Sequence, residues 1–161
     1  MTSDYRERKI EAYGNAYDEL VEGLKKFPRE MWGYRAESDP WTIHEIVVHI
    51  ADSEANSYVR FRRFIAEPGK DVMSYDEDKW NKALDYAGQD ADDAIELFRR
   101  LRGNTYRLVQ KVPESAWTNT VYHPQNGIMT LDDWLDVYES HVREHLEQMG
   151  RIYAAWQQKR S

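Results

Sequence analysis

Cysteine is absent from this chain of 161 residues. Disulfide bonds, thiolate metal sites and a cysteine nucleophile are therefore all excluded. The strong metal ligands that remain are histidine and carboxylate side chains, and the chain has five histidines. Any metal centre or acid–base site must be built from these groups.

An excess of positive charge is also lacking, because the formal net charge is -7. No basic tract offsets it, and a nucleic-acid partner would require a basic surface for its phosphates. No apolar run approaches the ~20 residues that span a bilayer, and the polar residues 1–6 lack the core of a signal peptide. We expect a cytoplasmic protein with neither a nucleic-acid nor a membrane partner.

Sustained β alternation, internal repeats, low-complexity segments and interdomain linkers are missing as well. Apolar residues recur instead at the three- and four-residue spacings of amphipathic helices. These stretches cover roughly residues 5–27, 42–67, 92–112 and 130–157, with a long connection between the second and the third. We therefore expect an all-α fold, in which a single domain over residues 1–161 forms a four-helix bundle with a long crossover between helices 2 and 3.

Two of the expected helices have a marked start. Thr42 and Glu45 have the spacing of a capping box, in which the threonine hydroxyl and the glutamate carboxylate each bind a free backbone N–H of the first turn. Thr130 and Asp133 have the same spacing ahead of the last helix. The apolar stripe of the second helix is expected to face inward as far as Ile65.

Three of the five histidines have the arrangement of metal ligands. His141 and His145 lie four residues apart, so in a helix they project from one face about one turn apart. His49 lies beside the apolar stripe of the second helix and is the best candidate for a third ligand. Three neutral imidazoles leave a coordination position for water, as in catalytic rather than structural zinc sites.

The same spacing is compatible with a protein that binds no metal. Such histidine pairs occur on solvated helix faces, and a lone histidine on an apolar helix is more often a satisfied core residue than a ligand. His44 lies about 140° from His49 around the helix, so these two cannot chelate one ion from one face. His123 falls in residues 119–127, which are expected to form a loop, either exposed or at the mouth of a site. The residues alone leave both interpretations open.

Four segments carry the most distinctive residues of the chain, and they occur in the order 41–53 (WTIHEIVVHIADS), 75–80 (YDEDKW), 123–127 (HPQNG) and 138–145 (YESHVREH). Together they extend over nearly the whole chain. In this order they resemble the DinB superfamily, and within it the YfiT-like branch. The resemblance implies a four-helix bundle with a nickel- or zinc-type site, to which the second helix gives one histidine and the fourth helix gives two.

The ligands that the resemblance implies are His49, His141 and His145, with one divalent transition metal per chain. Proteins of this kind have been described as metal-dependent hydrolases, and relatives use the ion to activate a low-molecular-weight thiol for S-transfer. The resemblance thus implies a small-molecule substrate, with a low-molecular-weight thiol among the candidates, and a homodimer. This chain has Glu144 where close relatives tend to have a further histidine, and it has Gln148 one turn beyond. The chemistry beside the ion can therefore differ.

Two carboxylates are candidates for catalytic roles beside such a site. Asp52 lies one turn from His49 and can orient the imidazole through its second nitrogen. Glu45 is equally near, but it also has the capping role. Glu144 lies about 60° from His141 around the helix and is placed to act as a general base on bound water.

Two classes of function remain open at this stage. The first is a metal-dependent enzyme, either a hydrolase or a thiol S-transferase, and the second is a helical bundle that binds a metal or ligand without turnover. Residues 141–145 also match the H-x-x-E-H pattern of some zinc peptidases, but so short a pattern recurs by chance. A ferritin-like di-iron site is excluded because no histidine has a glutamate three residues before it.

Overall fold

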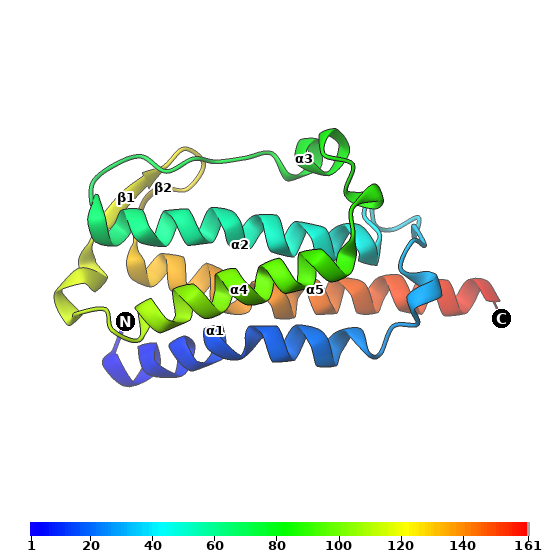
Figure 1. Cartoon of the computed structure of the whole chain (residues 1–161), viewed down its shortest axis with the longest axis horizontal. Helices are drawn as coiled ribbons and strands as arrows, with labels where there is room; N and C mark the ends of the chain where they lie inside the picture. The colour runs from blue at the N-terminus through cyan, green and yellow to red at the C-terminus, as the bar shows by residue number, and fades with distance from the viewer. Residues whose placement is uncertain (161) are drawn as a thin grey trace.

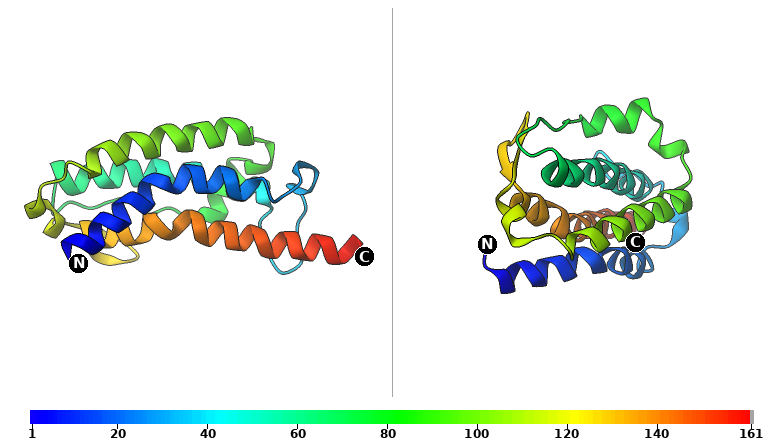
Figure 2. Two further views of the ribbon diagram at one scale, coloured as in Figure 1. Left: turned by 90° about the horizontal axis from the view of Figure 1, so that it is seen from below. Right: turned by 60° about the vertical axis from the view of Figure 1, so that its left-hand side comes forward.

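The computed structural model describes residues 1–160 and is dominated by four long helices. These run side by side along the bundle (Figures 1 and 2), and they are α1 (Ser3–Leu24), α2 (Ile43–Ala66), α4 (Ala91–Val109) and α5 (Leu131–Arg160). The largest helix interfaces join α2 to α4 and α1 to α5. The four-helix bundle expected from the sequence is therefore confirmed. Within residues 1–160, none of the helices is both long and apolar enough to cross a lipid bilayer.

The connection between α2 and α4 is the expected long crossover, and it runs along the outer side of α2 (Figure 1). It contains the short helix α3 (Glu77–Ala83) and the single 3-10 turn Tyr86–Gly88. Asp76 caps α3, because its carboxylate accepts a hydrogen bond from the Lys79 backbone N–H at 3.0 Å. The crossover thus contains regular secondary structure and is not an irregular loop throughout.

Both expected capping boxes are present. At the start of α2, the Thr42 hydroxyl accepts from the Glu45 N–H at 3.2 Å, and the Glu45 carboxylate accepts from the Thr42 N–H at 2.7 Å. At the start of α5, the Asp133 carboxylate accepts from the Thr130 N–H at 2.7 Å, and the Thr130 hydroxyl accepts from the Asp133 N–H at 3.2 Å. These bonds satisfy N–H groups that have no partner inside the helix, so they fix where each helix begins.

One segment differs from the expectation. Residues 119–127 were expected to form a loop, but strands β1 (Thr120–His123) and β2 (Gly127–Thr130) form an antiparallel hairpin there. Four-residue strands are too short to show sustained alternation, although Val121 and His123 both face inward. His123 is only 4% exposed, and its Nδ1 accepts from the backbone N–H groups of Gln125 and Asn126 at 3.2 and 3.3 Å. The alternative of an exposed His123 was therefore wrong.

The interior contains two apolar clusters separated along the bundle by buried polar side chains. One cluster is built around Ile46, Phe98 and Met149, and the other around Phe61 and Trp134. The buried polar residues between them come from α2, α4 and α5 and include Ser53, Glu54, Ser57, Arg102, Thr105 and Glu139. The hydroxyl of Tyr13 on α1, whose ring belongs to the second cluster, donates to Glu54 in this layer. A polar layer within an apolar interior must be internally hydrogen-bonded or carry a function.

Candidate metal centre

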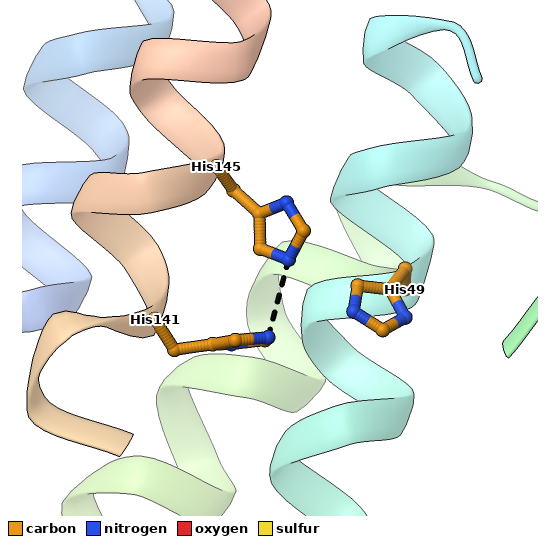
Figure 3. Close-up of side chains that lie close together, drawn as sticks. All are labelled: His49, His141 and His145. Carbon is orange, nitrogen blue, oxygen red and sulfur yellow. Dashed lines mark hydrogen bonds between the residues drawn. The ribbon is translucent and has the colours of Figure 1, made fainter. Parts of the chain in front are cut away.

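His49 on α2 faces His141 and His145 on α5 across the helix interface (Figure 3). One ligand atom from each of the three side chains lies within 4.8 Å of the others. The Nε2 atoms of His141 and His145 are 3.1 Å apart, and the His49 ring centroid lies 4.9 Å from that of His145 and 5.5 Å from that of His141. Within residues 1–160 this is the one group of three side chains that could hold a metal ion. The structure thus brings the three predicted ligands together.

The three imidazoles are held in the neutral form by their surroundings. His49 is fully buried, and this burial together with the nearby His145 lowers its pKa to about 3. Burial also lowers the pKa of His141 and of His145, and the pKa of His141 is lowered further because a second positive charge would be repelled by Arg102 and by a protonated His145 or His49. Neutral imidazole is the form that binds a metal ion, so these side chains need no proton loss near neutral pH.

Two features of the histidines fit a divalent transition metal. Both ring nitrogens of His49 are buried without a hydrogen-bond partner, which is costly for a polar group in an apolar interior. An ion would satisfy one of these nitrogens. Metal–nitrogen distances near 2.0–2.1 Å at tetrahedral angles place two ligand nitrogens about 3.3 Å apart. The 3.1 Å between His141 and His145 is close to this value.

Aromatic side chains enclose the cluster. The ring of Trp41 packs edge-on against His49 at 4.8 Å between centroids, and Tyr138 packs against His141 at 6.2 Å. The Trp41 Nε1–H donates to the Asp78 carboxylate at 2.8 Å, which ties this wall to α3. The crossover therefore helps to cover the His49 side of the centre.

His145 is the one ligand candidate with a polar partner beyond the cluster. Its Nδ1 lies 2.9 Å from Gln148 Oε1. The Gln148 Nε2 in turn donates to both carboxylate oxygens of Asp39, at 3.1 and 3.0 Å. Gln148 was noted in the sequence only as a departure from relatives, and Asp39 carried no sequence signal.

The predicted catalytic carboxylates lie outside the group of histidines. Asp52 Oδ2 accepts from the Tyr86 hydroxyl at 2.6 Å, and Asp52 lines a cavity of about 250 Å³ between α2 and α4. Glu45 is occupied by the capping box and by Arg35, whose Nη2 donates to it at 2.7 Å. The Glu144 side chain is exposed on α5.

An ion pair in the polar layer was missed in the sequence. Arg102 on α4 and Glu54 on α2 are each 1% exposed and are joined at 2.7 Å, and the Tyr13 hydroxyl donates to Glu54 at 2.7 Å. Arg102 follows Phe98 by four residues on the inward face of α4. A charged residue at an inward helical position was the signal that could have revealed it.

A larger cavity of about 550 Å³ lies between α2 and the crossover. Its lining combines apolar side chains with the amide of Asn56, the ring of Trp80 and the guanidinium groups of Arg60 and Arg63. Arg60 donates to the Tyr138 hydroxyl at 2.8 Å and to the Met73 carbonyl at 2.6 Å. The arginines near the end of α2 thus fasten the crossover and also line a space large enough for a small molecule.

Comparison with known proteins relates this arrangement to a family. The sequence profile of the DinB superfamily matches residues 12–149. YfiT of Bacillus subtilis is 31% identical over 113 residues, which are 70% of this chain and 64% of YfiT. OB0782 of Oceanobacillus iheyensis is 27% identical over 109 residues, which are 68% of this chain and 63% of OB0782. The names of both relatives assign them provisionally to the metal-dependent hydrolases, and the matched part spans slightly less than two thirds of each.

Solved structures share the fold. The structure of Bacillus subtilis YfiT, described as a probable metal-dependent hydrolase with an unusual four-helix bundle topology, superposes with a TM-score of 0.86. The match covers 94% of this chain and 87% of that one, at 23% identity. A mycothiol-dependent maleylpyruvate isomerase superposes with a TM-score of 0.72 at 14% identity, over 93% of this chain and 64% of the isomerase.

Proposed function

This chain belongs to the DinB superfamily, in its YfiT-like branch, and from that premise we propose that it is a metal-dependent enzyme acting on a small molecule. One observation carries the proposal: within residues 1–160, three neutral imidazoles, that of His49 fully buried and those of His141 and His145 half-buried, converge without a fourth ligand in their group. A closed structural site would have four protein ligands, whereas three leave a position for water or substrate.

In this proposal His49, His141 and His145 hold one divalent ion, with nickel or zinc as the candidates. The bound ion would act as a Lewis acid and lower the pKa of a water or thiol that it binds toward neutrality. Trp41 and Tyr138 pack against the imidazoles, hold their orientation and exclude bulk water from that side.

Proton transfer requires a group within hydrogen-bond reach of the reacting atoms. Both predicted carboxylates lie outside the group of histidines: Asp52 already accepts from Tyr86, whereas Glu144, on an exposed position of α5 directly before His145, is close enough for its charge to act on His145 in the direction of a raised pKa. We therefore propose Glu144 as the first candidate for a general base and Asp52 as the second. Glu144→Gln would then lower kcat while metal affinity stays close to that of the wild type.

Hydrolysis and thiol S-transfer are both compatible with this centre. The names of the relatives favour hydrolysis. The mycothiol-dependent isomerase with the same fold favours a low-molecular-weight thiol as co-substrate. We further propose that the protein acts in the cytoplasm as a homodimer, which size-exclusion chromatography with light scattering would test.

Activity assays separate these proposals. Protein loaded with nickel or zinc is incubated with activated esters and with electrophiles, in each case with and without added thiol. Turnover without thiol supports a hydrolase, and turnover that requires thiol supports an S-transferase. His49→Ala should abolish either activity, while His44→Ala, a histidine whose Nε2 bonds the Gln89 carbonyl instead, should retain it. Metal binding without turnover of any substrate would favour the non-catalytic alternative.

A further inference from the structure

Asp39 and Gln148 form a line of hydrogen bonds that ends on His145. We infer that these two residues are positioning residues, which set the His145 tautomer so that its Nε2 lone pair faces the other two histidines. The role that we assign to these residues rests on the proposed metal centre, but the His145 tautomer can be measured in the protein without any metal.

Asp39 determines which atoms donate and which accept along this series of hydrogen bonds. A carboxylate accepts hydrogen bonds and an amide nitrogen donates them, so the Gln148 nitrogen must face Asp39. Both carboxylate oxygens lie within 3.1 Å of that nitrogen. The Gln148 amide oxygen is thereby directed away from Asp39 and toward His145 Nδ1, 2.9 Å away.

The orientation of the amide then determines the imidazole. An amide oxygen only accepts, so His145 Nδ1 must carry the hydrogen. A neutral imidazole has one N–H group, which leaves Nε2 of His145 with a lone pair. This atom lies 3.1 Å from Nε2 of His141, within the group of three (Figure 3). In metal sites, the ring nitrogen that does not bind the ion usually donates to a neighbouring acceptor, which fixes the tautomer of the histidine. Gln148 is the acceptor in this position beside His145.

The segment that contains Asp39 contacts the His49 side of the centre as well. Asp39 Oδ1 accepts from the Trp41 backbone N–H at 3.0 Å, and the Trp41 ring packs against His49. Thr42, the next residue, caps the helix that carries His49. Residues 39–42 thus contact both His49 on α2 and, through Gln148, His145 on α5. This arrangement can hold the two histidines in fixed relative positions.

A direct test reads the tautomer in the metal-free protein. Long-range ¹H–¹⁵N correlation spectra of the ¹⁵N-labelled chain distinguish a protonated Nδ1 from a protonated Nε2 in each histidine. We expect His145 to be protonated on Nδ1. A His145 protonated on Nε2 would overturn the inference, whatever the protein does with metal ions.

Exchanging the carboxylate and the amide between positions 39 and 148 tests whether these hydrogen bonds affect metal affinity. Gln148→Glu alone places two carboxylates opposite each other, and Asp39→Asn alone removes the group that orients the Gln148 amide. The double variant Asp39→Asn plus Gln148→Glu restores a continuous series of hydrogen bonds. The amide nitrogen introduced at position 39 can donate to the carboxylate introduced at position 148, which can still accept from His145 Nδ1, and the amide oxygen at position 39 can still accept from the Trp41 N–H. Zinc affinity is measured by competition with a chromophoric chelator, and cobalt(II) absorption reports the ligand geometry.

We expect each single variant to lose about 10-fold or more in zinc affinity and the double variant to recover most of it. Gln125→Glu, the same change on the exposed hairpin turn, should bind zinc as the wild type does. Thermal unfolding of the metal-free variants provides the structural control.

Wild-type affinity in both single variants would overturn the inference, and so would an affinity loss that only follows the loss of thermal stability. A wild type with the expected tautomer that binds neither zinc nor nickel would instead contradict the proposed function and leave the tautomer assignment intact.

Discussion

At the scale of single residues, His49 is the side chain that is hardest to explain without an ion. It is fully buried, and its pKa of about 3 means that it is neutral at any physiological pH. A neutral imidazole in this position still has one donor and one acceptor, and both nitrogens lack a partner. Ligation through one nitrogen is the simplest way to satisfy the residue.

The buried pair of Arg102 and Glu54 leads to a stability prediction. Arg102→Met removes the partner of a buried carboxylate, and such a loss costs about 3–5 kcal/mol. We expect this decrease in the free energy of unfolding in urea. Arg100→Met on the exposed side of α4 is the matched control and should unfold as the wild type does.

A second variant separates the charge from the packing in this pair. Combining Arg102→Met with Glu54→Gln removes both charges and keeps an acceptor for the Tyr13 hydroxyl, so most of the lost stability should return. A double variant as unstable as Arg102→Met alone would show that the arginine stabilises through its contacts with Tyr13 and Phe98 instead.

At the scale of helices, the Thr42 cap fixes the start of the helix that carries His49. Thr42→Ala removes the hydroxyl that accepts from the Glu45 N–H, so the free energy of unfolding should fall by about 1 kcal/mol. Thermal unfolding followed by circular dichroism measures the change. Thr42→Ser keeps the hydroxyl and should retain nearly all of the stability, and equal losses in both variants would contradict the capping role.

The start of α5 gives a prediction for pH. Hydrogen bonds from Arg6 lower the pKa of Asp132, and they outweigh the opposite effect of burial. A carboxylate with a lowered pKa in the folded state stabilises the protein above its ordinary pKa of ~4, and this stabilisation is lost as the pH falls through the lowered value. Asp132→Asn should therefore cost about 2 kcal/mol at pH 7 and much less at pH 3 in urea unfolding. An equal cost at both pH values would contradict this account.

The helices and the proximity of His141 to His145 could be predicted because their signals are local, whereas local spacing alone did not place His49 beside them. Capping boxes at Thr42 and Thr130 and the four-residue spacing of His141 and His145 depend only on helix geometry. Tertiary packing determined which apolar residues of each helix are buried, and this could not be predicted in detail. The apolar pattern predicted that Ile65 faces inward, but it is 39% exposed, and Phe64 is buried near the end of α2 instead.

The hairpin and Asp39 show the same limit in other ways. The strands of the hairpin pair with each other, and β1 also bonds to the crossover, since the Val72 N–H donates to the Tyr122 carbonyl at 2.9 Å. The hydrogen bonds that relate Asp39 to His145 run through Gln148, 109 residues away in sequence. Contacts of this range leave no periodic trace in the sequence.

At the scale of the whole molecule, the ligands belong to two helices that are distant in sequence, so a bound ion would join α2 to α5. Binding to the folded state alone stabilises it by about 4 kcal/mol when free metal exceeds Kd 1,000-fold. Excess zinc or nickel should raise the melting temperature of the metal-free protein, and a chelator should reverse the rise. A rise of the same size in His49→Ala would place the stabilising ion elsewhere.

Metal content is the most direct measurement of the central claim. Protein without a histidine tag is purified as wild type, His49→Ala, His141→Ala plus His145→Ala, and His44→Ala, then incubated with nickel or zinc, desalted and measured by mass spectrometry. We predict close to one ion per chain in the wild type and in His44→Ala, and little in the other two. Equal, low metal content in all four proteins would contradict the three-histidine centre and with it the proposal of a metal-dependent enzyme.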